Sequence, residues 1–233
     1  MWDHLSSSDD AMTTLPTTIE ALPLFPLQTV LFPGGSLPLR IFEVRYLDMI
    51  GSRHKAGLPF GVVCLSEGSD TRQRASDAAE GFAREAFHPV GTLARIVKFE
   101  RPQPGLMMIE CVGSQRFRVD RSELLKHGLW VADVSLLADD AEMPVPDDLA
   151  FTRAALQGVV RDIALRIEQD GAGGFEMPFL EPYRWDDCGW LANRWCEMLP
   201  LEPALKHRLM ALDGPVLRLE LVADTLGQMG LAA

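Results

Sequence analysis

Prolines interrupt the apolar residues between Leu22 and Tyr46 at short intervals, and no other feature of the chain restricts its fold as strongly. A proline has no N–H group to donate, so within a sheet it is confined to edge strands, strand ends and turns. We therefore expect short strands here. Gly34 and Gly35 provide the backbone freedom for a tight reversal, and the helical spacing after Phe42 predicts a short helix. The prolines concerned are Pro23, Pro26, Pro33 and Pro38.

Short strand-like runs continue as far as residue 138. The segment Arg101–Gly105 has the residues of a hairpin loop between two of them. Several short strands need a closed or packed sheet to cover their edges. We therefore predict a small β-barrel over residues 21–138, with one short helix. The strand-like runs are Phe60–Leu65, Val90–Phe99, Leu106–Val112, Phe117–Val119 and Trp130–Val134.

The period of the apolar residues becomes helical in the last part of the chain. The acidic, proline-bearing stretch Ala138–Pro146 predicts a linker, and Asp147 or Asp148 can cap the helix that follows. We predict a helical subdomain over residues 139–233, packed as a bundle on or beside the barrel. Residues 1–20, rich in Ser, Thr and Asp, predict a loose tail. The fold class expected is therefore α+β.

Charge is distributed unevenly along the chain, whose formal net charge is −11. After residue 135 there are 17 acidic and 8 basic residues, against 16 and 14 before it. Proteins that bind nucleic acid concentrate positive charge, because phosphate contacts provide most of their affinity. Nucleic acid is thus an improbable partner. The acidic half is interpreted as a solvated helical face or as a docking surface for a basic partner.

The sequence indicates no membrane span and no export signal. No segment approaches the ~20 uninterrupted apolar residues that a spanning helix needs, and the first residues are acidic and polar where a signal peptide would be basic and then apolar. We expect a cytoplasmic protein. Its four cysteines lack CxxC spacing, which favours reduced core thiols, and we expect neither a metal nor a cofactor.

Two ordered blocks of residues resemble the LON domain, the substrate-binding N-terminal domain of ATP-dependent Lon proteases, which also occurs as a free-standing protein. The resemblance runs from about Leu22 to about Leu226 and implies a LON-type, PUA-like barrel followed by helices. The first block comprises Leu22–Leu27, Val30–Gly34, Leu37–Leu39, Ile41–Glu43 and Arg45–Tyr46; the second comprises Val90–Ile96, Gly105, Glu110, Gly113 and Arg116–Arg118.

Motifs for catalysis are absent from this sequence. It contains no GxxxxGK[ST] phosphate-binding loop and no GxSxG elbow. Asp213-Gly214-Pro215 resembles the residues before the nucleophilic serine of Lon's proteolytic domain, but Val216 follows and has no hydroxyl group. We therefore expect recognition without ATPase or protease activity.

The resemblance implies a module that binds proteins or peptides, with edge strands and apolar crevices as its physical basis. Two sets of residues are candidates for the site. Residues of the first set could orient a bound chain, or they could stabilise the start of the helix and form a local ion pair. In the second, aromatic side chains could form an adaptable rim or fill the junction between barrel and bundle. The first set is Glu43, Arg45 and Tyr46; the second is Phe175, Met177, Phe179, Tyr183 and Trp185.

Three functional hypotheses follow from these patterns. The leading one is a module without enzymatic activity that binds unfolded or extended protein segments and delivers them to a protease or chaperone in trans. The second is an RNA-associated protein, because LON domains resemble the barrel of RNA-modification modules. The third is a hydrolase with a site assembled from dispersed Asp, His and Cys residues. The sequence indicates no particular oligomeric state.

Overall fold

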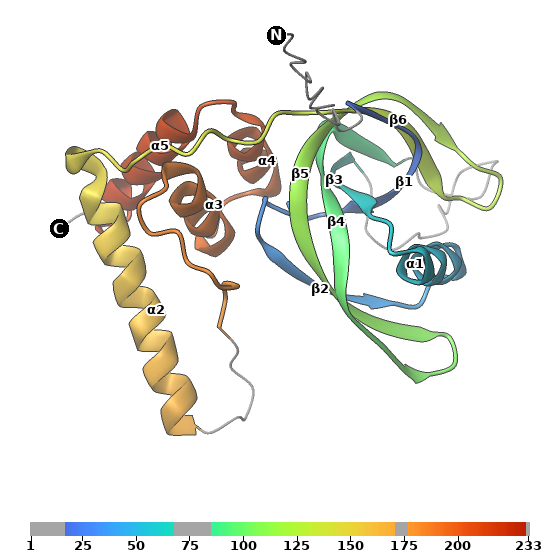
Figure 1. Cartoon of the computed structure of the whole chain (residues 1–233), viewed down its shortest axis with the longest axis horizontal. Coiled ribbons are helices and arrows are strands. Elements are labelled where there is room, and N and C mark those ends of the chain that lie inside the picture. Colours follow the sequence, from blue (N-terminus) through green and yellow to red (C-terminus); the bar gives the residue numbers. More distant parts are fainter. Residues whose placement is uncertain (1–16, 68–84, 171–176, 232–233) are drawn as a thin grey trace, which may run out of the picture.

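A computed structural model shows a β-barrel and a group of helices packed against it (Figure 1). It describes residues 17–67, 85–170 and 177–231. The predicted α+β class is confirmed. The strands are β1 Thr18–Leu27, β2 Ser36–Ile41, β3 Phe60–Glu67, β4 Ala86–Gln103, β5 Leu106–Leu124 and β6 Trp130–Leu136. The helices are α1 Val44–Ala56, α2 Ala150–Asp170, α3 Cys188–Met198, α4 Pro203–Ala211 and α5 Pro215–Gln228, with a short 3-10 turn, η1 Asp147–Leu149, before α2.

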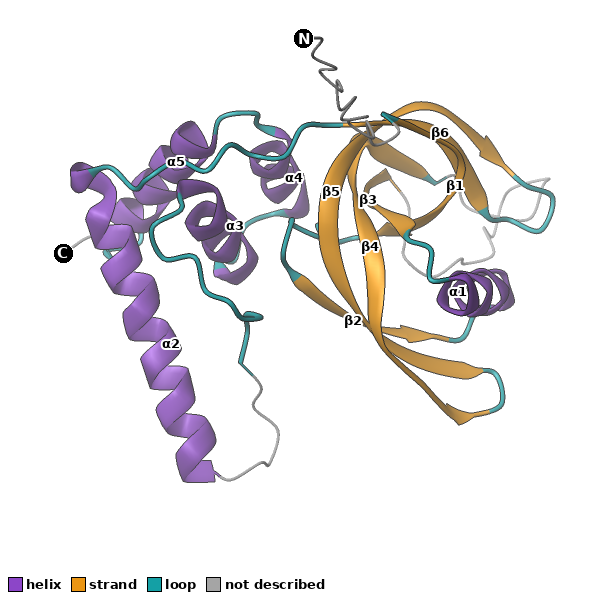
Figure 2. Ribbon diagram, viewed as in Figure 1, coloured by secondary structure: helices purple, strands orange, loops and turns teal. Residues whose placement is uncertain are grey.

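The barrel closes because β5 changes partners along its length. The sheet order is β2-β5-β4-β3-β1-β6, and β5 also pairs with β6. Over Met107–Val112 β5 pairs with β2, and over Phe117–Leu124 it pairs with β6. Five strands thus form a closed circuit that has no free edge, whereas β2 is an additional strand with β5 as its one neighbour in the sheet. Figure 2 shows the barrel and its curved long strands.

Two prolines lie inside β1, which has a neighbour on each side, and this differs from the expected restriction to edges and turns. Pro23 pairs with Val131 of β6, and Pro26 pairs with Val63 of β3. The pairing with β6 ends at Leu24, where the pairing with β3 begins. Each proline therefore has a single pairing strand locally, so that one side of the main chain at each proline has no strand that needs its N–H group.

The predicted reversal before β2 forms at Pro33 and Gly34, where Gly34 has φ +73°. Gly35 N–H donates to Phe32 O at 2.9 Å and closes the turn. Helix α1 follows β2 directly, as the sequence predicts, and Tyr46 and Ile50 are buried in the barrel core. The hairpin between β4 and β5 turns at Pro104 and Gly105.

The helices surround α3, whose residues Cys188 to Cys196 are all buried. A helix buried on every side is apolar over most of its surface, and α3 carries Trp190 and Trp195. Asp187 caps it by accepting a hydrogen bond from Gly189 N–H at 2.9 Å. The same core includes Phe32 and Val90 of the barrel, so it extends across the junction. Of the helices in the described ranges, none has the length and hydrophobicity needed to cross a bilayer.

The observed boundaries differ slightly from those expected. β1 begins at Thr18, so three residues that the sequence assigned to the N-terminal tail belong to the first strand. Thr17 precedes the strand, and the rest of the tail, residues 1–16, lies outside the described residues, as do residues 68–84 and 171–176.

Candidate functional site

The three predicted site residues at the start of α1 form an internal contact. Arg45 is 7% exposed and donates hydrogen bonds to Glu43 at 3.0 Å, Glu85 at 3.3 Å and the carbonyl of Gly128 at 2.7 Å. Tyr46 is 3% exposed and stacks on Phe25, with ring centroids 4.0 Å apart. Arg45 and Tyr46 are therefore placed to hold α1 against the barrel, which favours the structural interpretation of this set.

The predicted loop residues divide into three groups. Phe175 lies outside the described residues. Phe179 is buried against Trp190, and Tyr183 and Trp185 pack on the same indole, so these rings fill the helical core. Met177 is half-buried and lines a cavity against the barrel. One member of this set thus lies where it can contact a ligand, and the aromatic members have the core-filling role.

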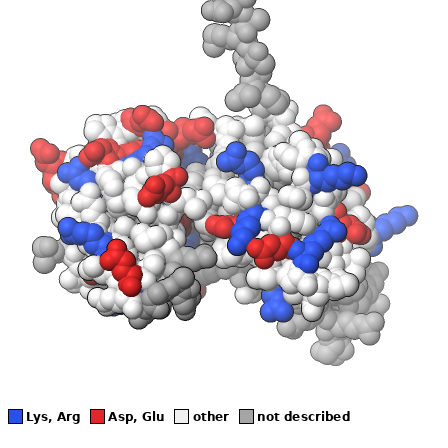
Figure 3. Space-filling model, turned by 60° about the horizontal axis from the view of Figure 1, so that its bottom comes forward, with Lys and Arg blue, Asp and Glu red and all other residues white. Residues whose placement is uncertain are grey.

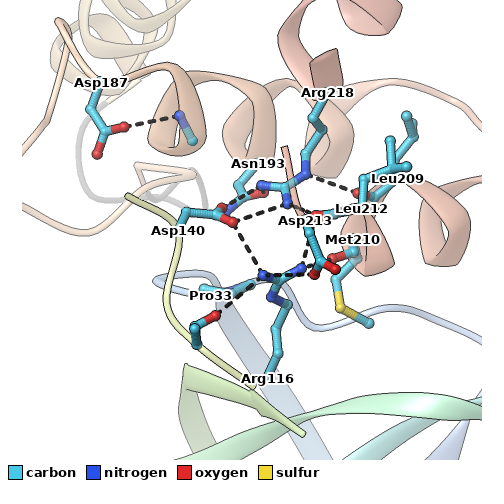
Figure 4. A network of polar contacts seen from close by, with 12 residues as sticks. Pro33, Arg116, Asp140, Asp187, Asn193, Leu209, Met210, Leu212, Asp213 and Arg218 are labelled. Carbon is cyan, nitrogen blue, oxygen red and sulfur yellow. Dashed lines mark hydrogen bonds and ion pairs between the residues drawn. The ribbon is translucent and has the colours of Figure 1, made fainter. Parts of the chain in front are cut away.

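Two buried arginines and a carboxylate connect the barrel to the helices (Figure 4). Arg116 of β5 donates to Asp140 at 3.2 Å and to the carbonyl oxygens of Met210 and Leu212 at 3.0 and 2.9 Å. Arg218 of α5 donates to the same carboxylate at 2.5 Å. Asp140 therefore neutralises charge from both parts of the molecule, which buried arginines require.

A second buried arginine contact holds the turn before β2. Arg194 of α3 is 1% exposed and donates to the carbonyl oxygens of Gly34 at 2.7 Å and Pro33 at 3.0 Å. It also donates to Glu197 at 2.6 Å. Burial raises the pKa of the Glu197 carboxyl to about 7, and the adjacent guanidinium opposes this shift. The turn that leads into β2 is thus fixed by the helical part.

Two cavities lie on the outside of the barrel next to the segment that leads into α3. The first, here the junction cavity, has a volume of about 840 Å³. The second, here the edge cavity, has a volume of about 540 Å³. They are adjacent because both are lined by Lys98, Glu110 and Leu180. Together they form one groove bordered by β2, β4, β5 and residues 177–190.

The groove exposes large apolar side chains. Val97 is 51% exposed, Met108 46% and Leu180 37%, and each lines one or both cavities. Single exposed apolar residues are common, but a group of them in a concave surface indicates an interaction site. The groove is the part of the described structure best suited to contact another molecule.

Charges around the groove are of both signs. Lys98 pairs with Glu100 at 3.2 Å, and Arg184 pairs with Asp187 at 2.6 Å. On the face seen in Figure 3, basic and acidic side chains are interspersed. A mixed surface of this kind does not attract a uniformly charged polymer, so its electrostatics suit a polypeptide better than a nucleic acid.

Comparison with known proteins identifies the family. The model of the ATP-dependent protease La (LON) substrate-binding domain matches residues 21–228. The chain belongs to the LON substrate-binding domain family. The resemblance noted in the sequence is thereby confirmed.

Relatives of this LON domain agree with the assignment. A Lon protease of Flavobacterium johnsoniae is 27% identical over 148 residues, which are 63% of this chain and 16% of that protein. The chain thus spans about a sixth of the length of this relative. The crystal structure of a Lon N-terminal domain protein from Xanthomonas campestris is 29% identical, with a TM-score of 0.63, and covers 88% of this chain and 97% of its own.

A more distant structure agrees in fold alone. The N-terminal domain of the Mycobacterium avium complex Lon protease is 17% identical, has a TM-score of 0.53, and covers 88% of this chain and 97% of its own.

Sequence reasoning missed most of the groove of this LON domain. Arg116 belongs to the second LON-like block, but nothing in the sequence indicates its burial or its link through Asp140 to Arg218. Met108 and Leu180 were not singled out at all. The one sequence pattern that could indicate such residues is an apolar residue between charged residues or prolines. This pattern is too common to distinguish a groove from an ordinary strand face.

Proposed function

We propose that this LON domain binds extended or unfolded segments of other proteins in the groove formed by the junction and edge cavities. The observation that carries this proposal is the group of exposed apolar side chains in a concave surface beside an edge strand. An extended chain can fill such a groove with alternate side chains while its main chain pairs with the strand edge. The family to which the chain belongs is described as substrate-binding, which supports this function.

We also propose that the protein acts without catalysis of its own. The match covers the substrate-binding domain, and the sequence contains neither the phosphate-binding loop nor a serine after Asp213-Gly214-Pro215. Bound segments would then be passed to a protease or chaperone acting in trans. The relatives named above are a Lon protease, a Lon N-terminal domain protein and the N-terminal domain of a Lon protease, which supports a protease as the recipient.

Fluorescence polarisation with an array of labelled unstructured peptides tests the binding role. We expect saturable binding that becomes at least tenfold weaker in the double variant Met108→Glu and Leu180→Glu, because both changes place carboxylates in the apolar groove. The matched control is Leu165→Glu on α2, since Leu165 is 53% exposed and lines neither cavity.

Three results would contradict the proposed binding role or the proposed absence of catalysis. Peptide binding that is equal in the folded double variant and the control would exclude the groove. Binding of an RNA oligonucleotide at low salt by a protein that binds no peptide would favour the RNA-associated alternative. Cleavage of a bound peptide by the pure protein, with or without ATP, would contradict the absence of catalysis.

A further inference from the structure

Among the strands of the described residues, none covers one edge of β2. It pairs with β5 and stands at the end of the sheet order. The phase of its ladder is set by Gly113 N–H, which donates to Gly35 O at 2.9 Å. Hydrogen-bonded pairs recur at every second residue of an antiparallel ladder. Leu37 and Leu39 therefore bond to β5, whereas the even-numbered residues direct their main-chain groups away from it.

The even-numbered residues of β2 are Ser36, Pro38 and Arg40. Pro38 has no N–H group, which agrees with its main chain pointing to the free edge. Pro38 and Arg40 are exposed. Within the described part of the chain, no main-chain hydrogen bond from outside the ladder reaches these three residues. The edge therefore offers the N–H groups of Ser36 and Arg40 and three carbonyl oxygens.

The edge cavity lies over the outer face of the sheet, where residues of β2 line it together with residues of β4 and β5. Its lining combines the outward-facing side of β2 with apolar side chains that exclude water from part of the space. Met108 pairs with Arg40 across the sheet, and Leu180 faces the same cavity from the segment before α3. A cavity of about 540 Å³ is within the range that binds ligands in proteins. An added strand would need to lie about 4.8 Å from β2.

One charged group in the edge cavity has no partner in the described residues. Lys98 pairs with Glu100 at 3.2 Å, and Ser36 Oγ donates to Glu110 at 2.8 Å. Arg40 also lines the cavity, and the described residues provide it with no ion pair or hydrogen-bonded side chain. Arg40 is therefore a cation of this edge without a counter-charge among the described residues, and its natural complement is a carboxylate.

We propose that the free edge of β2 binds a partner's extended segment as an added strand, with a carboxylate side chain opposite Arg40 and an apolar side chain two residues away opposite Pro38, on the face of the sheet that carries the edge cavity. This inference rests on the proposed binding of extended segments and specifies its geometry and chemistry. The missing donor of Pro38 leaves a gap of one hydrogen bond in the middle of the added strand, which limits the affinity and restricts edge-to-edge pairing between copies.

The chemical preference can be tested with two probes. Both are fluorescein-labelled ten-residue peptides in which threonine alternates with leucine. The first carries a single central aspartate, and the second carries a lysine at the same position. We expect the aspartate peptide to bind at least tenfold more tightly, and Arg40→Glu to reverse this order. The matched control is Arg118→Glu, because Arg118 is exposed on β5 and lines neither cavity. An order unchanged by Arg40→Glu in a folded protein would overturn the role of Arg40.

The strand geometry has an independent test. Single N-methyl groups placed along the aspartate peptide remove one amide donor at a time, so strand addition predicts loss of affinity at every second residue of the paired part. Pro38→Thr restores an edge donor and should tighten binding severalfold. An affinity that is unchanged by N-methylation at every position would overturn strand addition, whereas the proposed function would stand. Binding of neither peptide nor any member of the wider array would overturn both.

Discussion

Gly113 lies where β5 passes under the turn that precedes β2. A Cβ atom at this position would stand 2.3 Å from the carbonyl oxygen of Phe32, which is main chain and cannot move aside. We expect Gly113→Ala to lower the free energy of unfolding by about 2–3 kcal/mol, as overpacking does elsewhere. Chemical denaturation followed by circular dichroism measures the change.

The matched control for this glycine is Gly158 in α2. A Cβ there would meet no atom within 4 Å, so Gly158→Ala should raise the free energy of unfolding by about 0.5–1 kcal/mol through reduced backbone entropy. Opposite signs for the two substitutions are expected. Equal effects would show that the close approach of β5 to the turn is not rigid.

Elements of the barrel and the helices meet through a pair of histidines. His207 of α4 stacks on His88 of β4 with ring centroids 4.2 Å apart, and His207 Nε2 lies 3.0 Å from the carbonyl oxygen of Val90. Since that oxygen only accepts, Nε2 carries a proton and donates it in this hydrogen bond. Burial, followed by the neighbouring His88, lowers the pKa of His207 below its usual value of 6.5.

Because the pKa of His207 is lowered by folding, this histidine makes the folded protein less stable as the pH falls. Below pH 6.5 the unfolded chain binds more protons at this histidine than the folded protein, so its contribution is present above pH 6.5 and is lost as the pH falls. We expect the free energy of unfolding to fall less between pH 7.5 and 5.5 in His207→Gln than in the unmodified protein. His54→Gln, exposed on α1, is the control. Equal pH dependence in all three proteins would contradict this contribution.

The elements themselves could largely be predicted from the sequence, because prolines, glycines and periodicity act locally. Pro203 and Pro215 begin α4 and α5 as expected of the first helical turn. The partner change of β5 could not be predicted in this way. Strand pairing depends on which distant residues meet, and nothing local distinguishes the half of β5 that binds β2 from the half that binds β6.

At the scale of the whole molecule, the groove depends on how the barrel and helices are joined. Aromatic residues typical of a rim can be found in the sequence, but buried Phe179 and Tyr46 are indistinguishable there from exposed aromatic residues. The apolar residues that do face the groove, Met108 and Leu180, come from segments 72 positions apart. Their proximity is a consequence of tertiary packing, which a single sequence does not show.

Asp140 makes this joining testable, because its carboxylate binds Arg116 of the barrel and Arg218 of the helices at once. In Asp140→Asn two buried guanidinium groups lose their shared counter-charge, which costs about 3 kcal/mol when one partner of a buried pair is removed. Asp213 is 3.7 Å from Arg116 but 86% exposed, so it replaces little of the loss. Guanidinium unfolding followed by tryptophan fluorescence and by far-UV circular dichroism measures both parts.

Because the network spans the junction, we expect both signals of Asp140→Asn to shift to lower denaturant together. The control is Asp186→Asn, which removes an exposed pair with Arg153 and should change the free energy of unfolding by less than about 0.5 kcal/mol. Loss of the tryptophan signal, to which Trp185, Trp190 and Trp195 of the helical part contribute, at lower denaturant than part of the circular dichroism signal would mean that the barrel is stable without this contact. The groove would then be formed by two parts that unfold independently, and its shape would not be fixed by the fold of either one.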